Sequence, residues 1–239
     1  MEHTIQLPFG YEDKKGVIHR DVIFSQRLTA GDFMLLDTDP QATNPTQYGD
    51  LVRRKMITKF GDLRLPVDLS VLLSLNSIDR EELQIGADEF IRTSRGKAVS
   101  EFMPDNRVRL YFGFEIDGTR YPVVEIGRMT TGRDEVEADR LSSRGITREC
   151  FLLGQMITRI TTADSEATVE GPIKLELFNQ LDAEDLNLLR IGARLAEATF
   201  RFRGRTVSGE RDGEGGIGND ARDGHERGGD PEPSAATAG

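Results

Sequence analysis

Residues 51–60 read Leu51-Val-Arg-Arg-Lys-Met-Ile-Thr-Lys-Phe60, and residues 151–160 read Phe151-Leu-Leu-Gly-Gln-Met-Ile-Thr-Arg-Ile160. Residues spaced by four lie on one side of an α-helix, so this spacing of apolar residues predicts an amphipathic helix in each segment. The first helix is predicted to open at Pro45 and to stop near Gly61. The apolar residues with this spacing are Val52, Met56 and Phe60, and then Leu152, Met156 and Ile160.

Short segments on either side of this helix also recur, in the same order, about one hundred residues later. The pattern predicts a tandem duplication of one small domain of roughly 90–100 residues. The alternative is that amphipathic elements of similar type follow one another without shared origin. The recurring pairs are Leu7–Tyr11 with Leu110–Phe114, Val22–Gly31 with Val123–Gly132, Pro66–Leu69 with Pro172–Leu175, Asn76–Leu83 with Asn179–Leu186, and Ile85–Ala87 with Ile191–Ala193.

Each copy is predicted to begin with a β-hairpin. Apolar residues alternate from Ile5 to Tyr11, as in a half-buried strand, and Val22–Leu28 can return as the partner strand. The second copy alternates from Val108 to Ile116 and continues into Asp117-Gly118, a strong hairpin-turn signal.

The predicted fold class is α+β, with two tandem repeats that each consist of a β-hairpin and three or four short helices. Repeat 1 covers residues 1–92, a linker covers 93–107, and repeat 2 covers 108–200. Residues 201–239 hold ten of the 25 glycines and no lysine. Because such a segment cannot bury much apolar surface, it is predicted to be a disordered Gly/Asp/Arg-rich tail.

Helix starts carry clear local signals in both copies. Thr29 with Asp32, and Thr131 with Asp134, have the form of a capping box. Asp79 with Glu82, and Asp182 with Asp185, are predicted as the N-cap and third residue of the last helix of each copy. Capping accounts for these acidic pairs, so they are not candidates for acid–base chemistry.

Composition restricts the possible function. The net charge of −10 opposes binding to nucleic acid or to an anionic membrane. The sequence contains no run of about 18 apolar residues, and its N-terminus lacks a signal-peptide pattern. We therefore expect a soluble protein in the cytoplasm of a bacterial host cell.

Candidate catalytic and metal-binding residues form no recognisable group. His3, His19 and His225 are far apart in sequence and are expected on the surface. Cys150 lies among apolar residues, which favours a buried small side chain over a nucleophile. Gly213–Gly218 has the glycine content of a phosphate-binding loop but follows no predicted strand. We predict a protein that is not an enzyme and has no cofactor or metal.

The last helix of the second copy carries more apolar residues than one buried stripe requires. Leu186, Leu189 and Ala193 form the first stripe, and Phe200 continues it. The surplus residues either pack against the other copy or bind a partner helix. The candidate partner-binding residues are Leu188, Ile191, Leu195 and Phe200.

Several of these motifs together resemble the tail assembly chaperones of Mu-like and P2-like contractile-tailed phages. The resemblance covers most of residues 5–92 and 108–198. Members of that family are single-copy proteins, so two copies and a glycine-rich tail are departures. The matching segments are Arg27-Leu-Thr-Ala-Gly-Asp32, the helix around Met56, and Leu75-Asn-Ser-Ile-Asp-Arg-Glu-Glu-Leu83, then Arg128-Met-Thr-Thr-Gly-Arg-Asp134 and Phe178-Asn-Gln-Leu-Asp-Ala-Glu-Asp-Leu186.

The resemblance implies a non-enzymatic chaperone of a phage tail or contractile injection system. Such a chaperone binds the tape-measure protein, or another helical tail protein, until tail tube protein displaces it. One alternative is a structural tail or baseplate adaptor of a phage-like particle. Another is an unrelated bacterial binding module. Neither the residues nor the resemblance fixes an oligomeric state.

Overall fold

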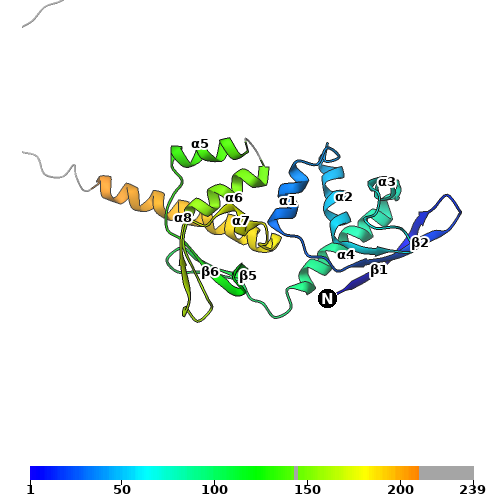
Figure 1. The fold of residues 1–239 in the computed structure, drawn as a ribbon, viewed down its shortest axis with the longest axis horizontal. Helices are drawn as coiled ribbons and strands as arrows, with labels where there is room; N and C mark the ends of the chain where they lie inside the picture. Colours follow the sequence, from blue (N-terminus) through cyan, green and yellow to red (C-terminus); the bar gives the residue numbers. More distant parts are fainter. Residues whose placement is uncertain (143–144, 210–239) are drawn as a thin grey trace, which may run out of the picture. The chain divides into compact units, whose positions relative to one another are not determined.

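The computed structural model describes the backbone of residues 1–142 and 145–209, and side chains up to Phe202. Residues Met1–Arg201 form one compact unit. The fold is mixed α+β, and the described residues form two antiparallel sheets and eight α-helices (Figure 1).

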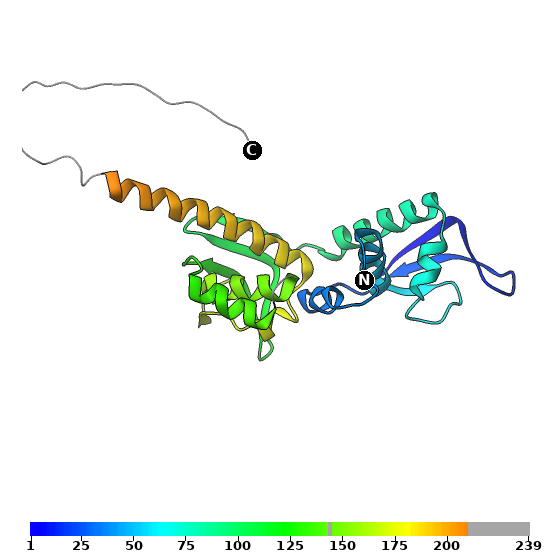
Figure 2. The same ribbon diagram turned by 90° about the horizontal axis from the view of Figure 1, so that it is seen from above.

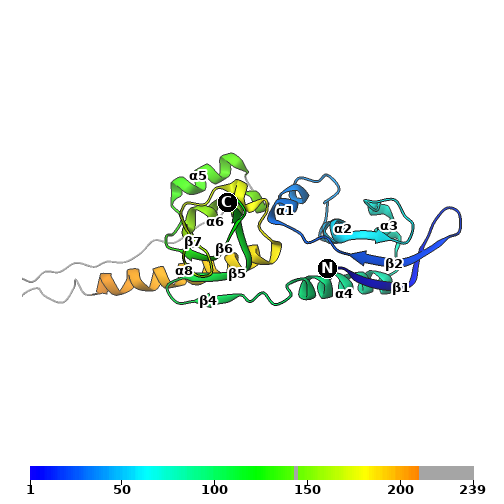
Figure 3. The same cartoon turned by 60° about the horizontal axis from the view of Figure 1, so that its bottom comes forward.

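The first sheet has the order β1-β2-β3. The predicted hairpin is confirmed, since β1 pairs with β2 in antiparallel fashion. Helix α4 covers one face of this sheet and lies along β1 (Figure 3). The elements of this half are β1 (His3–Glu12), β2 (Ile18–Phe24), α1 (Ala30–Asp37), α2 (Pro45–Met56), β3 (Ile57–Phe60), α3 (Leu69–Ser74) and α4 (Ser77–Ser94).

The second sheet has five strands in the order β4-β5-β6-β7-β8. The predicted turn is confirmed, because Asp117 and Gly118 join β5 to β6 and both have positive φ. Helix α8 packs on this sheet (Figure 2). The elements of this half are β4 (Glu101–Met103), β5 (Arg107–Ile116), β6 (Thr119–Ile126), α5 (Gly132–Leu141), α6 (Gly145–Met156), β7 (Ile157–Thr161), β8 (Thr168–Glu170), α7 (Leu175–Phe178) and α8 (Ala183–Gly209).

The repeated Met-Ile-Thr segment is half helix and half strand, so the prediction of a helix through it was wrong. Helix α2 opens at Pro45 as predicted but ends at Met56, and α6 ends at Met156. The next residues are β3 and β7. A spacing of four is close to one helical turn and is also a multiple of two, so Met56 and Phe60 fit either structure. The β-branched Ile-Thr pair in each copy favours the strand.

Two other predicted boundaries differ from the structure. The segment 93–107, predicted as a linker, includes β4, which pairs with β5 at the edge of the second sheet. Helix α8 continues to Gly209, so residues 201–209 of the predicted tail are helical. The rest of that tail, residues 210–239, lies outside the described residues.

Both predicted capping boxes are confirmed. The Thr29 side chain accepts a hydrogen bond from the Asp32 N–H, and the Asp32 carboxylate accepts one from the Thr29 N–H at 3.0 Å. Thr131 and Asp134 repeat this arrangement at the start of α5.

The prediction that Asp79 caps the last helix of the first half was wrong. Asn76 is the N-cap of α4, and its side chain accepts from the N–H groups of Ile78 and Asp79. Asp79 is instead fully buried and accepts hydrogen bonds from the N–H groups of Phe9 (3.0 Å) and Gly10 (2.9 Å). Those two N–H groups lie at a shift in the β1–β2 register, where a bulge removes them from the ladder.

Asp185 has the same role in the second half. It is fully buried, and it accepts from the N–H groups of Tyr111 (2.7 Å), Phe112 (2.9 Å) and Gly113 (2.8 Å). The β5–β6 register also shifts here. Each sheet is therefore tied to its covering helix by a buried carboxylate near the start of that helix.

A candidate partner-binding surface at the joint and on α8

The two halves meet through a short antiparallel bridge between Thr29 and Asp182. The Ala30 N–H donates to the Leu181 carbonyl at 2.8 Å, and the Ala183 N–H donates to the Leu28 carbonyl at 3.0 Å. Ala30 belongs to the hydrophobic core of the second half, while Ala183 packs against that of the first. Each half thus contributes one alanine to the core of the other.

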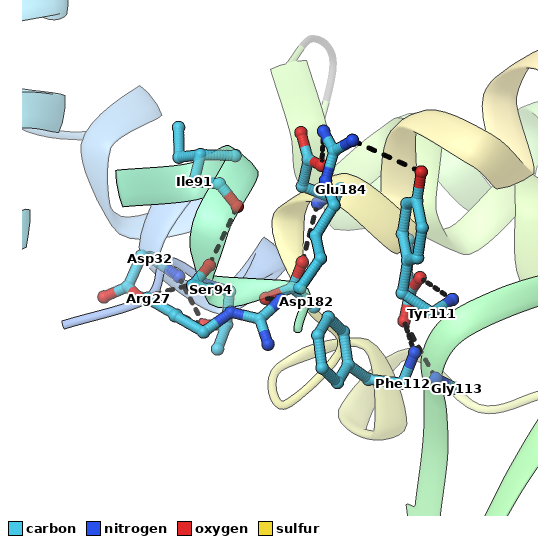
Figure 4. A network of polar contacts seen from close by, with 12 residues as sticks. Arg27, Asp32, Ile91, Ser94, Tyr111, Phe112, Gly113, Asp182 and Glu184 are labelled. Atoms are coloured by element: carbon cyan, nitrogen blue, oxygen red, sulfur yellow. Dashed lines mark hydrogen bonds and ion pairs between the residues drawn. The ribbon is translucent and has the colours of Figure 1, made fainter. Parts of the chain in front are cut away.

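Two arginines strengthen this joint with charge and aromatic contacts. The Arg27 guanidinium lies 3.4 Å from the centre of the Phe112 ring and forms an ion pair with Asp182 at 2.5 Å (Figure 4). Arg95 lies 4.9 Å from the Tyr111 ring, donates to the Tyr111 hydroxyl at 3.3 Å, and forms an ion pair with Glu184. Such contacts favour one orientation of the joined elements.

Helix α1 extends the joint, because it contacts both α2 of its own half and α6 of the other. Its Met34 side chain packs against the core of the second half. At its C-terminal end, the Asp37 carboxylate accepts a hydrogen bond from the Ile146 N–H. The first half therefore presents one complete helix to the second.

Gly31→Ala is expected to loosen this joint. A Cβ at position 31 would lie 2.7 Å from the carbonyl oxygen of Asn179 and 3.0 Å from its Cα. Both atoms belong to the backbone, so the free energy of unfolding should fall by about 1–3 kcal/mol in chemical denaturation. Gly132→Ala is the matched control, because a Cβ there meets no atom within 4 Å. Equal losses in both variants would contradict this account of the joint.

Burial raises the pKa of the Asp182 carboxyl to about 6, although the Arg27 charge and the Glu184 N–H oppose this shift. A carboxyl whose pKa is higher in the folded state than in the unfolded chain takes up a proton more readily when folded. Asp182 should therefore favour folding more as the pH falls from 7 through 6.

This pH dependence is measurable as a difference between the native protein and Asp182→Asn. Between pH 7.5 and pH 5, the native protein should gain about 1 kcal/mol of stability relative to the variant. Taking the difference removes the effect of other carboxyls, such as Asp32 and Asp134, whose pKa values are lowered and which lose stability in acid. A difference that is flat, or of opposite sign, would show that burial does not dominate at Asp182.

Next to the joint is an apolar cavity of about 120 Å³. Apolar cavities of roughly 150 Å³ can hold a group of benzene size, so one apolar side chain could enter this one. Arg27, Asp182 and Glu184 are among its polar lining residues, and Asn187 of α8 completes one side. The apolar lining includes Leu28, Phe33, Val52, Met56, Phe90 and Ile91.

An exposed apolar strip continues from this cavity along α8. Asn187, Ile191, Leu195 and Ala198 are spaced by four, four and three, so they lie within about 80° of one another around the helix. Ile191 is 46% exposed and Leu195 is 52% exposed, and Ala198 is also exposed. We call the cavity together with Ile191, Leu195 and Ala198 the α8 surface.

The four candidate residues from the sequence divide into two pairs. Ile191 and Leu195 lie open on the α8 surface, so the first half does not cover them. Leu188 and Phe200 are partly buried and pack against the core of the second half. The cavity was not predicted, because its walls come from segments more than 150 residues apart in the sequence.

The cysteine and the histidine of the sequence that lie in the interior are held by packing and hydrogen bonds. Cys150 is buried, as predicted, and burial raises the pKa of its thiol to about 12. His19 was expected on the surface, but it is buried, and its Nδ1 accepts from the Asp62 N–H at 3.3 Å. His225 lies outside the described residues.

Within residues 1–142 and 145–202, no three His, Cys, Asp or Glu side chains are grouped as metal ligands. Across the same part of the chain, no helix combines the length and the apolar character needed to cross a membrane. Comparison of the chain with known protein families, curated proteins and solved structures finds no match.

Proposed function

We propose that this protein is a non-enzymatic assembly chaperone that binds a helical partner on the α8 surface. The observation that carries the proposal is the strip of Ile191 and Leu195, which is open to solvent and begins one helical turn after Asn187, a lining residue of the apolar cavity. An amphipathic helix presents apolar side chains at the same spacing, so it can lie along such a strip and place one side chain in the cavity.

The partner that fits best is the tape-measure protein of a phage tail or contractile injection system, or another long helical tail protein. This assignment comes from the family resemblance of the motifs. A long amphipathic helix is prone to aggregate while its apolar side is exposed. A chaperone that covers this side keeps the partner soluble until tail tube protein assembles around it.

The size of the α8 surface agrees with reversible binding. Because Ile191 and Leu195 are about half exposed, covering each contributes about 1 kcal/mol, and one side chain placed in the cavity contributes about 1.5–3 kcal/mol more. These contributions sum to roughly 3.5–5 kcal/mol, about as much as association itself costs, so a single α8 surface binds weakly and tube protein can displace it. The net charge of −10 opposes aggregation of the chaperone itself.

We also propose that the two halves descend from one duplicated unit. The order hairpin, capped helix, second helix, strand, short helix and final helix occurs in both. The buried carboxylates Asp79 and Asp185 support this relation, since each binds the bulge of its own hairpin. Their hydrogen bonds relate Asp79 to Asp185, whereas the spacing of the recurring sequence segments relates Asp79 to Asp182.

Co-expression tests the chaperone function. The native chain should raise the soluble fraction of the long helical protein expected from the adjacent reading frame. Leu195→Asp should lose most of this effect, since it places a charge in the middle of the α8 surface. Val99→Asp is the control, because Val99 is 69% exposed and lies away from α8 in the sequence. No change in solubility with the native chain would refute the function.

A structural adaptor in a tail or baseplate is the second candidate. The ion pairs of Arg27 and Arg95 across the joint support this candidate, because they favour one orientation of the two halves. An adaptor needs a fixed orientation to hold its neighbours in place. Mass spectrometry of purified particles separates the two functions. A chaperone is absent from finished particles, whereas an adaptor is present.

A further inference from the structure

The joint inside the chain is a contact between two different surfaces. The first half contributes a projecting surface, formed by the segment Arg27–Gly31 and by Met34 of α1. The second half contributes a receiving surface, formed by Phe112 and the segment Leu181–Ala183, and the adjoining Glu184 pairs with Arg95 of the first half. If both halves are built alike, each half carries a projecting and a receiving surface. The joint uses the projecting surface of the first half and the receiving surface of the second, which leaves the other two surfaces unused.

The projecting surface of the second half is open. Its capping box places Thr131 where the first half has Thr29, so Gly132 corresponds to Ala30 and Val136 to Met34. Ala30 is fully buried and Met34 packs on a core. By contrast, a Cβ at Gly132 would meet no atom within 4 Å, and Val136 is 53% exposed. Met129, which corresponds to Arg27, is also exposed.

The receiving surface of the first half is open as well. The buried carboxylates place Phe9 and Ile78 where the second half has Phe112 and Glu184. Phe112 has Arg27 against its ring, whereas Phe9 is 55% exposed. Ile78 is 50% exposed. Exposed apolar residues thus lie at the positions that take part in the joint in the other half.

We infer that a second copy of this chain binds here, with the projecting surface of its second half on the receiving surface of the first half. The open surfaces are complementary: Met129 and Val136 on one side, and Phe9 and Ile78 on the other, are all apolar. Thioether sulfur contacts aromatic rings favourably, so Met129 can take the place over Phe9 that Arg27 takes over Phe112.

The contact is heterologous, so each added copy leaves one surface of each kind free at the ends. Chains joined in this way form open filaments, or closed rings of two or more copies. The inference rests on the correspondence of the two halves and does not require the proposed partner to be correct.

Sedimentation velocity of the full chain, without any partner, tests this inference. The weight-average mass of the native chain should rise from 26.6 kDa to about twice that value or more as concentration increases to about 1 mM, where even millimolar contacts are populated. Val136→Lys removes the projecting surface, and Phe9→Lys removes the receiving surface. Each variant alone should stay monomeric. Val99→Lys is the control and should associate like the native chain.

Mixing the two variants provides the decisive comparison. Each retains the surface that the other lacks, so an equimolar mixture should form dimers and nothing larger. Circular dichroism establishes that both variants remain folded, as expected for changes at exposed positions. The inference is overturned if the native chain stays monomeric, if either variant alone still associates, or if the mixture does not pair.

Discussion

Asp185→Ala is expected to lower the free energy of unfolding by about 3–5 kcal/mol, because it leaves three buried N–H groups without an acceptor. These groups belong to Tyr111, Phe112 and Gly113, and they lie 2.7–2.9 Å from the Asp185 carboxylate. The bulge in β5 removes them from the sheet, so no strand carbonyl can replace the lost carboxylate. Chemical denaturation of the full chain measures the loss.

Asp79→Ala should cost less, about 2–4 kcal/mol, because Asp79 accepts from two backbone N–H groups instead of three. Asp185→Asn retains one acceptor oxygen, so its effect should fall between those of the native chain and Asp185→Ala. Asp88→Ala, at an exposed position of α4, should change stability by less than about 0.5 kcal/mol. A loss below about 1 kcal/mol for Asp185→Ala would show that the bulge does not depend on this carboxylate.

Gly113→Ala is expected to destabilise the protein by about 3 kcal/mol or more, from backbone strain and overpacking together. Gly113 has φ of +76°, and a Cβ would lie 2.4 Å from the Tyr121 carbonyl oxygen. Gly10 has the same role in the first half, with φ of +79° and a Cβ that would lie 2.4 Å from the His19 carbonyl oxygen. Gly10→Ala should therefore have a similar effect.

Gly118→Ala separates the two contributions. Gly118 has φ of +75°, but a Cβ there meets no atom within 4 Å. This variant should lose only about 1 kcal/mol, the cost of the left-handed backbone itself. If Gly113→Ala and Gly118→Ala lost equal amounts, the close approach of β6 to the bulge would not matter.

Features with local causes could be predicted from the sequence. The Asp117-Gly118 turn and the two capping boxes depend on residues within four positions of one another, and all three are confirmed. The change from helix to strand after Met56 was missed because a spacing of four is compatible with both structures. The role of Asp79 was missed because its partners, Phe9 and Gly10, are about 70 residues away.

The α8 surface likewise has one part that could be predicted from local sequence and one part that could not. Its exposed residues Ile191 and Leu195 could be identified, since apolar residues beyond one buried stripe stand out in a helical pattern. The cavity could not, because it is formed where Phe33, Met56 and Phe90 come close to the start of α8. Nor could sequence spacing show that Leu188 and Phe200 pack on the core of the second half.

The central claim is that a helical partner lies along the α8 surface, and site-specific photo-crosslinking tests it most directly. A photoreactive phenylalanine derivative would replace Ile191, Leu195 or Val99 in separate variants, each co-expressed with the long helical protein expected from the adjacent reading frame. We predict a crosslink to that protein from position 195, a weaker one from position 191, and none from position 99. Equal crosslinking from positions 195 and 99, or crosslinking from position 99 alone, would contradict the claim.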